Sequence, residues 1–219
     1  MRIGRAHLIL AVLAPWLIAP RVAAAQVEPS TEVQAALDRQ KERSQRRERG
    51  LDAFQEELRP LAEGGDAVAQ FLIGTMLVGR DPVTAIPYLT RSAEHGCAGA
   101  AGLLAVYSWS SGKGGGDEWL ERAISGGDAA AMFVRATLHM RGDQGFEQST
   151  AEALAWAELA RVRSDSSGLT PEIERMIGAL RSAATADDAA AAAARLEALE
   201  NQYPKKPFYV CGQSVPSEG

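Results

Sequence analysis

The chain has 219 residues, of which 46% are hydrophobic, and this is enough to bury one core of ordinary size. Lys and Arg number 23 against 28 Asp and Glu, which gives a formal net charge of −5. An acidic chain gains nothing from counterion release at phosphate groups, so we expect neither nucleic acid nor an anionic membrane surface as a partner.

The segment 1–25 predicts a secretory signal peptide. Arg2 and Arg5 precede twelve mostly apolar residues, 8–19, and three Ala residues, 23–25, follow. An uncleaved membrane anchor is disfavoured because twelve helical residues rise only about 18 Å, against a hydrocarbon core of about 30 Å. Cleavage after Ala25 would leave 20 basic and 28 acidic residues, a charge of −8, on a periplasmic or secreted protein. We expect no other segment to insert into a membrane.

Residues 26–49 predict a short tether followed by a charged helix. Ser30 or Thr31 can cap this helix, and six basic residues lie between Arg39 and Arg49. We interpret these charges as a solvated helix face, with an acidic partner as the alternative. Gly50 breaks or bends the helix.

From residue 50 to residue 163 the sequence repeats. The corners GGDAVAQ, HGCAGAA and GGDAAAM place Gly65, Gly96 and Gly127 at equal intervals, thirty-one positions apart. Other positions keep the same interval, namely Leu72, Leu103 and Val134, then Gly74, Ala105 and Ala136, and then Leu58, Leu89 and Leu120. Many positions in one register indicate a structural repeat far more strongly than a single motif does.

Each unit predicts two helices, A and B. The Gly that ends helix B suits the left-handed position just after a helix. Asp81 can cap a helix B, Pro82 suits its first turn, and Ser149 with Glu152 forms the pattern of a capping box. Gly in mid-helix costs about 1 kcal/mol against Ala, so Gly74 predicts a close helix crossing.

These residues resemble the Sel-one-like repeat (SLR), a relative of the tetratricopeptide repeat. GDAVAQFLIGTML with AIPYLTRSAEHG fits that pattern best, and GDAAAMFVRATLH with EALAWAELA fits a last repeat. The resemblance implies an all-α, right-handed α-solenoid with an N-terminal helix and a C-terminal helical cap. It also implies a non-enzymatic scaffold of the bacterial cell envelope that binds another protein or peptide on the concave face of the stack, without a cofactor. The first two units depart from the family in their short loops, and the middle unit lacks the Gly at the end of helix A.

The C-terminal part predicts a helical cap over residues 164–203. Thr170-Pro171-Glu172 begins one helix, and Thr185 with two Asp residues begins the next. A repeat stack needs a terminal cap with a polar outer face, and we assign these helices to that role. Residues 204–219 hold three Pro residues and no helical period, so we expect an extended tail.

The Gly-rich stretch SWSSGKGGGDEWL allows a chemical alternative. Its Ser110 and Lys113 have the S-x-x-K spacing of a serine acyl-enzyme, which predicts a β-lactam-binding or hydrolysing protein as the second hypothesis. The supporting S-D-N and K-T-G elements of those enzymes are missing from the sequence. Because a loop tip with three Gly residues holds a nucleophile poorly, we favour a connecting loop. A phosphate loop is excluded by Tyr107 and Gly114 at two of its required positions.

Two Cys residues remain in a space that we expect to be oxidising. Cys97 stands at the corner position of Asp66 and Asp128, which we expect to be exposed. A disulfide with Cys211 would close a loop of more than 100 residues, and two unpaired thiols are the equal alternative.

The remaining residues predict binding rather than metal chemistry. Only His95 and His139 follow the cleavage site, without metal-ligand spacing, so we expect no metal. Arg135 and His139 replace core residues on one helix face, where they could grip a carboxylate. The alternative is that Arg135 snorkels or pairs with Glu152 or Glu158. We predict that Trp119 and Trp156 pack in the core and that the partner-binding wall consists of Phe71, Thr75, Met76, Tyr107, Trp109, Arg135 and His139.

Overall fold

The structure is a computed structural model that describes residues 27–45, 51–164 and 169–205, together with Cys211. The predicted signal peptide and most of the predicted tail lie outside the described residues. The described part of the chain is all-α, with ten helices and no strand, as the sequence predicts. None of these helices is long and apolar enough to cross a bilayer.

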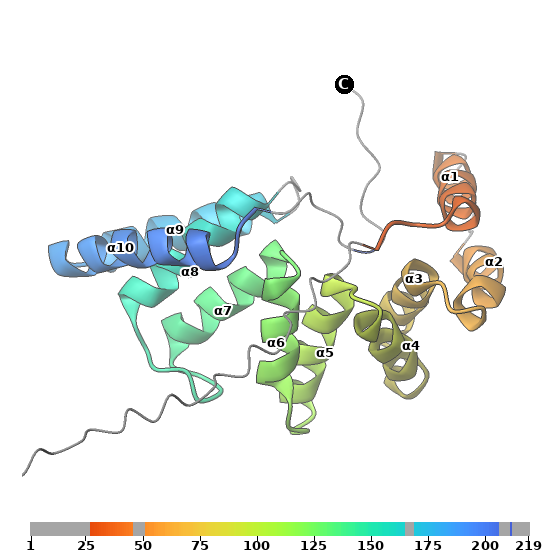
Figure 1. The fold of residues 1–219 in the computed structure, drawn as a ribbon, viewed down its shortest axis with the longest axis horizontal. Coiled ribbons are helices and arrows are strands. Elements are labelled where there is room, and N and C mark those ends of the chain that lie inside the picture. The colour runs from red at the N-terminus through yellow and green to blue at the C-terminus, as the bar shows by residue number, and fades with distance from the viewer. Residues whose placement is uncertain (1–26, 46–50, 165–168, 206–210, 212–219) are drawn as a thin grey trace, which may run out of the picture.

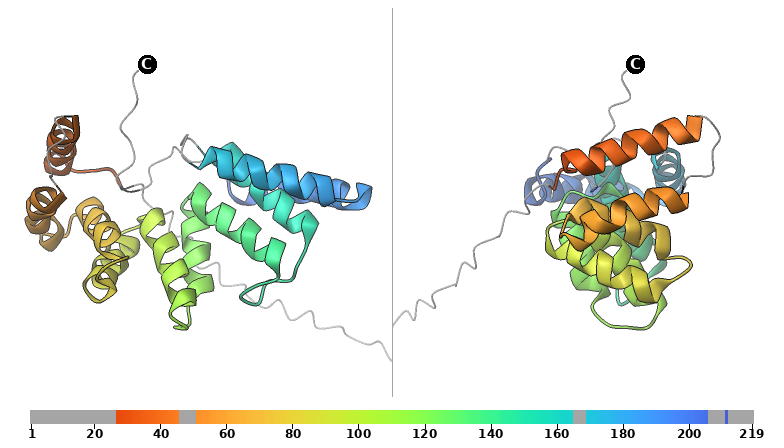
Figure 2. Two further views of the ribbon diagram at one scale, coloured as in Figure 1. Left: turned by 180° about the vertical axis from the view of Figure 1, so that it is seen from behind. Right: turned by 90° about the vertical axis from the view of Figure 1, so that its right-hand side faces the viewer.

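The helices follow one another in pairs along a curved row, which is the arrangement of a helical solenoid (Figure 1). Each helix A packs on its own helix B, and each helix B then packs on the next helix A. Figure 2 shows the same succession from behind and from one end. The bounds are α1 Thr31–Gln45, α2 Leu51–Glu63, α3 Ala67–Leu77, α4 Pro82–Glu94, α5 Ala98–Ser110, α6 Gly116–Ser125, α7 Ala129–Arg141, α8 Thr150–Arg163, α9 Thr170–Ala183 and α10 Ala186–Gln202.

Three glycine corners join the units, and they have the same geometry. Gly65, Gly96 and Gly127 take φ values of 98°, 94° and 91°, in the left-handed region. At the first corner the Gly65 N–H donates to the Ala62 carbonyl and the next N–H donates to the carbonyl five residues back, and the other two corners repeat both bonds. This is the Schellman pattern, which satisfies the last carbonyls of a helix. The predicted equivalence of the three corners is confirmed.

The residue after each corner glycine begins the next helix. Asp66 accepts hydrogen bonds from two N–H groups of α3, and Asp128 accepts one from Ala130. Cys97 makes no such bond and is instead joined to Cys211 by a disulfide across a sequence separation of 114 residues. One short corner therefore ends a helix B, turns the chain and starts the next helix A.

The expectation that these corner residues are exposed is wrong for two of them. Cys97 is 1% exposed and Asp128 is 5% exposed. The physical reason at Asp128 is close packing against the preceding helix A, because a Cβ on Gly102 would lie 2.9 Å from an Asp128 carboxylate oxygen. Because Gly102 has no side chain, the Asp128 carboxylate can be buried against α5.

The helix A–helix B crossing in the first unit is as close as Gly74 predicts. A Cβ on Gly74 would lie 2.6 Å from Leu89 Cγ, which belongs to a fully buried side chain of α4. The Ser92 hydroxyl of α4 also donates to the Ala67 carbonyl at 2.6 Å, inside the same interface. Because Gly74 has no side chain, the backbone of α3 lies directly against the Leu89 side chain of α4.

The predicted caps are present, with one correction. The Asp81 and Ser149 side chains accept from the N–H groups of Thr84 and Glu152, as expected. The capping box at Ser149 is only half formed, because the Ser149 N–H donates to the His139 carbonyl and Glu152 binds elsewhere. A complete capping box forms instead at the start of α10, between Thr185 and Asp188.

The charged N-terminal helix is tied to its neighbour. Arg39 and Arg43 of α1 both pair with Glu57 of α2, the first at 3.1 Å. These side chains are partly exposed, and such pairs contribute little to stability. The face is thus neither fully solvated nor free for an acidic partner at these two positions.

We predict opposite effects from the same substitution at two helical glycines. Gly74→Ala should lower the free energy of unfolding by about 1 kcal/mol, because overpacking outweighs the gain in helix propensity. Gly178→Ala, in the exposed middle of α9 with open space around it, should raise it by about 0.5–1 kcal/mol. Urea unfolding monitored by circular dichroism measures both, and equal signs would contradict the close crossing.

The buried carboxyl of Asp128 predicts a pH dependence. Burial raises the pKa of Asp128, and hydrogen bonds from backbone N–H groups oppose this only in part. With the folded pKa above the unfolded value of about 3.9, stability is lost as the pH rises from that value through the folded pKa. Asp128→Asn should therefore raise the melting temperature at pH 7 by about 2–4 °C, the effect of about 1 kcal/mol in a chain of this length.

The gain from Asp128→Asn should shrink as the pH falls toward 4, because the wild-type carboxyl is then protonated. Asp66→Asn is the matched control, since Asp66 occupies the same corner position but is only half-buried. This control should bring no gain at pH 7. A lower melting temperature for Asp128→Asn at pH 7 would show that the charge itself stabilises the corner.

Candidate functional site

The predicted binding wall does not form one continuous exposed surface. Phe71 is 9% exposed and belongs to the core, and Met76 and Trp109 pack against that core. Thr75 is exposed, but its hydroxyl donates to the Phe71 carbonyl at 2.8 Å within its own helix. Trp109 lies over Gly116, where a Cβ would come within 2.3 Å of the indole nitrogen. Most of these side chains therefore hold the helices together.

Tyr107 and His139 have local partners as well. The Lys113 ammonium lies 5.4 Å from the centre of the Tyr107 ring. The His139 ring meets Phe146 edge-on, with centroids 5.3 Å apart, and its Nδ1 lies 3.1 Å from the Glu147 carbonyl oxygen. His139 thus fixes the loop between α7 and α8.

Ser110 and Lys113 each contact Tyr107, and no hydrogen bond joins the two side chains in the described part of the chain. The Ser110 hydroxyl donates to the Tyr107 carbonyl at 3.0 Å, at the exposed end of α5. The Lys113 ammonium is directed at the ring of the same Tyr107. An acyl-enzyme needs its base within about 3 Å of the nucleophile, and here each group is engaged elsewhere.

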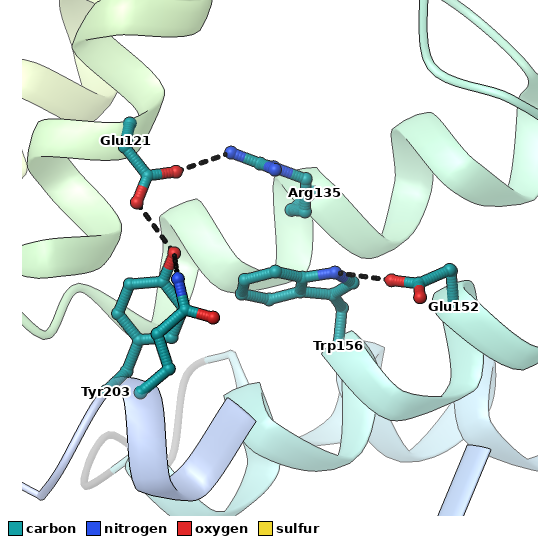
Figure 3. A network of polar contacts seen from close by, with 6 residues as sticks. Glu121, Arg135, Glu152, Trp156 and Tyr203 are labelled. Carbon is teal, nitrogen blue, oxygen red and sulfur yellow. Dashed lines mark hydrogen bonds and ion pairs between the residues drawn. The ribbon is translucent and has the colours of Figure 1, made fainter. Parts of the chain in front are cut away.

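Arg135 is the one predicted wall residue that belongs to the polar network around Glu121 (Figure 3). Its guanidinium donates to Glu121 of α6 at 3.0 Å and lies 4.9 Å from the Phe146 ring and 5.1 Å from the Trp156 ring. Neither acidic partner considered from the sequence is the one used. Glu152 binds the Trp156 indole and Arg195, and Glu158 binds two other Arg side chains.

In each of the three units an Arg guanidinium covers the aromatic ring of helix B, and the third unit uses an Arg from a different position. In the first two units an Arg three residues after the helix B aromatic covers it, Arg91 over Tyr88 and Arg122 over Trp119, each at 4.8 Å. In the third unit that position is Leu159, which is fully buried because α9 and α10 cover α8. Leu159 cannot stack on the ring as an Arg does, and Arg135 of α7 covers Trp156 instead.

Tyr203, at the end of α10, completes the network. Its hydroxyl donates to Glu121 at 2.6 Å, its carbonyl accepts from Arg163 at 2.7 Å, and its ring lies 5.7 Å from Trp156. Burial raises the pKa of the Tyr203 hydroxyl well above its usual value, and the hydrogen bond to Glu121 adds to this. The hydroxyl therefore stays protonated and donates over the physiological range.

A shallow cleft of about 640 Å³, wide open to solvent, lies beside this network, between α6, α7 and the loop before α8. Three carboxylates and two guanidiniums face it, with one aromatic ring. Glu121 and Arg135 neutralise each other, whereas Asp117 and Glu118 are exposed. The lining residues are Asp117, Glu118, Glu121, Arg122, Ser125, Arg135 and Phe146.

The position of this cleft differs from the predicted one. We expected a wall made by A helices, and the cleft lies mainly along a helix B, α6, with Arg135 as its contribution from a helix A. Among the described residues, no three His, Cys, Asp or Glu side chains are placed to hold a metal ion. The lining is suited to binding polar groups.

The sequence carried a signal for Glu121 that we did not use. Glu121 and Glu158 each stand two residues after the Trp of a helix B, and each binds an Arg of the following A or cap helix. This register predicts an inter-helix ion pair. Phe146 and Tyr203 had no comparable signal, since one lies in a loop and the other at a helix end.

Comparison with known proteins bears on the fold. No protein-family model and no curated protein matches the chain. A crystal structure of c5321, described as a protective antigen present in uropathogenic Escherichia coli strains displaying an SLR fold, matches with a TM-score of 0.60. The match has 19% sequence identity and covers 71% of this chain.

This chain has an SLR fold. The resemblance drawn from the glycine corners is confirmed at that level, and an identity of 19% carries no function with it. The chain spans about one third of its neighbour's length, since the match covers 34% of that chain.

We predict that Tyr203→Phe lowers the free energy of unfolding by about 1–2 kcal/mol, because a hydrogen bond to a partly buried carboxylate is lost. Tyr88→Phe is the matched control, since the Tyr88 ring is covered by Arg91 and its hydroxyl forms no hydrogen bond within the described part of the chain. This control should change the free energy by less than about 0.5 kcal/mol. Chemical unfolding measures both free energies. A loss for Tyr203→Phe no larger than the loss for Tyr88→Phe would mean that the hydroxyl of Tyr203 adds nothing and that only its ring stabilises the fold.

Proposed function

We propose that this chain is an exported, non-enzymatic module of the bacterial cell envelope that binds a partner protein through the cleft between α6 and α7. The observation that carries the proposal is the composition of the cleft. It presents charged side chains from two helices and the Phe146 ring from the loop before α8, with the Arg135 guanidinium held over the Phe146 and Trp156 rings and against Glu121. Sites built on helices hold their contact groups more rigidly than sites on loops.

The charge of the cleft favours basic groups of the partner. Glu121 and Arg135 form an ion pair and neutralise each other. Arg122 lies over the Trp119 ring, and Asp117 and Glu118 therefore leave the rim of the cleft with negative charge. Rim charges of this kind speed association and confer salt dependence more than they add affinity. A partner segment with Lys or Arg beside an apolar residue would complement both the rim and Phe146.

Two observations support export. The segment 1–25 has the charge and hydropathy pattern of a cleaved signal peptide. The disulfide between Cys97 and Cys211 is of the kind that persists in oxidising spaces such as the periplasm. A scaffold in that space would meet partners of the envelope.

The alternative function, an acyl-enzyme that binds or hydrolyses β-lactams, has little support. Ser110 and Lys113 are both exposed, and each is bound to Tyr107 rather than to the other. No other observation on the described residues favours an enzyme, so the binding hypothesis is the one we propose.

Photo-cross-linking in cells tests the binding cleft. A photoreactive amino acid at position 118, which lines the cleft, should give a covalent adduct with a partner protein. The same amino acid at position 94, an exposed Glu at the end of α4, is the control and should give none. Adducts of equal yield at both positions, or no adduct at position 118, would contradict the assignment.

A fluorescent penicillin tests the alternative. We expect no covalent label on the mature protein, because the Ser110 hydroxyl donates to the Tyr107 carbonyl and the Lys113 ammonium lies over the Tyr107 ring. The label is read on a denaturing gel, with a known penicillin-binding protein as the positive control. Labelling that disappears in Ser110→Ala would establish the enzyme hypothesis instead.

A further inference from the structure

The carboxylate of Glu121 is held by a residue outside the cleft that it lines. One of its oxygens accepts a hydrogen bond from the Tyr203 hydroxyl at 2.6 Å, and the other accepts from the Arg135 guanidinium at 3.0 Å (Figure 3). Arg135 also lines the cleft, whereas Tyr203 lies at the end of α10 and is not part of the lining. The geometry of the cleft therefore depends on a contact between residues 82 positions apart.

Tyr203 is itself fixed by contacts with three other residues. Its ring lies 5.7 Å from the Trp156 ring, and its carbonyl oxygen accepts from Arg163 at 2.7 Å. The Gln202 side-chain amide donates to the Tyr203 hydroxyl oxygen at 3.0 Å, which leaves the hydroxyl hydrogen for Glu121. The hydroxyl is thus a firmly placed donor.

Glu121 needs such a donor because 47% of its side chain is exposed to solvent. A long carboxylate side chain at a partly exposed position samples several rotamers unless a neighbour holds it. Ordering one such side chain on binding weakens affinity by a factor of about two to ten. The Tyr203 hydroxyl removes this cost because it fixes Glu121 before any partner binds.

Arg135 depends on Glu121 in turn. Its guanidinium lies over the rings of Phe146 and Trp156, and its side chain is 15% exposed. The Nε atom is buried and has no hydrogen-bond partner among the described residues, and Glu121 supplies the carboxylate that pairs with the guanidinium. A largely buried cation that loses its ion partner is strongly destabilised. A rotation of the Glu121 carboxylate away from Arg135 would therefore disturb the guanidinium as well.

We propose that Tyr203 is a positioning residue of the α6–α7 cleft. Through Glu121 it orders the Arg135 guanidinium, so the cleft is preorganised for its partner while this contact with the end of α10 is intact. A binding site holds its geometry when neighbouring hydrogen bonds lock the side chains that touch the partner. The proposal rests on the function proposed above for the cleft, and it adds a residue that lies outside the contact surface.

The ordered carboxylate favours a Lys or Arg side chain of the partner. A carboxylate has about four lone-pair sites, and Tyr203 and Arg135 use two of those on Glu121. A further donor can therefore bind Glu121 without displacing either residue. Asp117 lies one helical turn earlier on α6 and also lines the cleft, so it adds negative charge beside this position. We expect the basic group of the partner to bind between Asp117 and Glu121.

Nuclear magnetic resonance of the Arg135 side chain tests the positioning in the free protein. In Tyr203→Phe, we expect the Arg135 Nε–H to exchange with water at least about threefold faster than in the wild type, because the guanidinium is held less firmly. Tyr88→Phe is the matched control and should leave the rate unchanged, and the signal is assigned by its loss in Arg135→Lys. An unchanged rate in Tyr203→Phe would show that the two aromatic rings alone hold Arg135, which overturns the proposal.

Photo-cross-linking at position 118 tests the effect on binding. Tyr203→Phe should lower the adduct yield by a factor of about two to ten, because Glu121 must then be ordered when the partner binds. Gly74→Ala is the matched control for stability, since it destabilises the first unit and should leave the yield unchanged. In a Glu121→Ala background, Tyr203→Phe should bring no further loss, because Tyr203 acts through that carboxylate.

The outcomes separate this proposal from the function on which it rests. No adduct at position 118 in the otherwise unaltered chain would refute the cleft as a binding site, and the role of Tyr203 in binding would be refuted with it. Adducts of equal yield with and without Tyr203→Phe would refute the positioning alone. A loss in Gly74→Ala as large as that in Tyr203→Phe would also overturn the proposal, because stability rather than the placement of Glu121 would then set the yield.

Discussion

The left-handed glycine corner is the constraint on which the rest of this structure depends. A residue with a Cβ pays about 1–2 kcal/mol to adopt φ values near +90°, and the chain places glycine there three times. Each corner ends one helix, and the residue that follows it begins the next. Because the turn is the same at each corner, the helix pairs repeat the same orientation and form a stack rather than a closed bundle.

The stack places Glu121 where three parts of the molecule meet. Helix α6 belongs to the second unit, α7 to the third, and Tyr203 ends the last helix of the described chain. Glu121 holds Arg135 with one oxygen and Tyr203 with the other (Figure 3). The same carboxylate lines the cleft, so the surface proposed for binding and the docking of the C-terminal helix share one residue.

The sequence predicted the features that recur in the repeat units, and it did not predict the contacts that occur only once in the chain. The regular spacing of the glycines located the corners, and a glycine in mid-helix located the crossing with Leu89, because both constraints act through the local backbone. The cleft depends instead on long-range partners, such as Glu121 with Tyr203, which are 82 residues apart. The exposure of Asp128 was misjudged for a similar reason, since its burial depends on Gly102 in the preceding unit, and the buried Cys97 is bonded to a Cys 114 residues away. The stacking of Arg135 on Trp156 also involves a long-range feature, because the i+3 position in that unit, Leu159, is buried under the C-terminal cap.

The most direct measurement compares Ala substitutions at two glycines that both have open space around them. A Cβ would meet nothing within 4 Å at Gly65 or at Gly79, and only Gly65 has a left-handed backbone. The account predicts that Gly65→Ala lowers the free energy of unfolding by about 1–2 kcal/mol, while Gly79→Ala leaves it unchanged or raises it slightly. Equal effects at the two sites would contradict the claim that backbone conformation at the corners holds the repeat stack together.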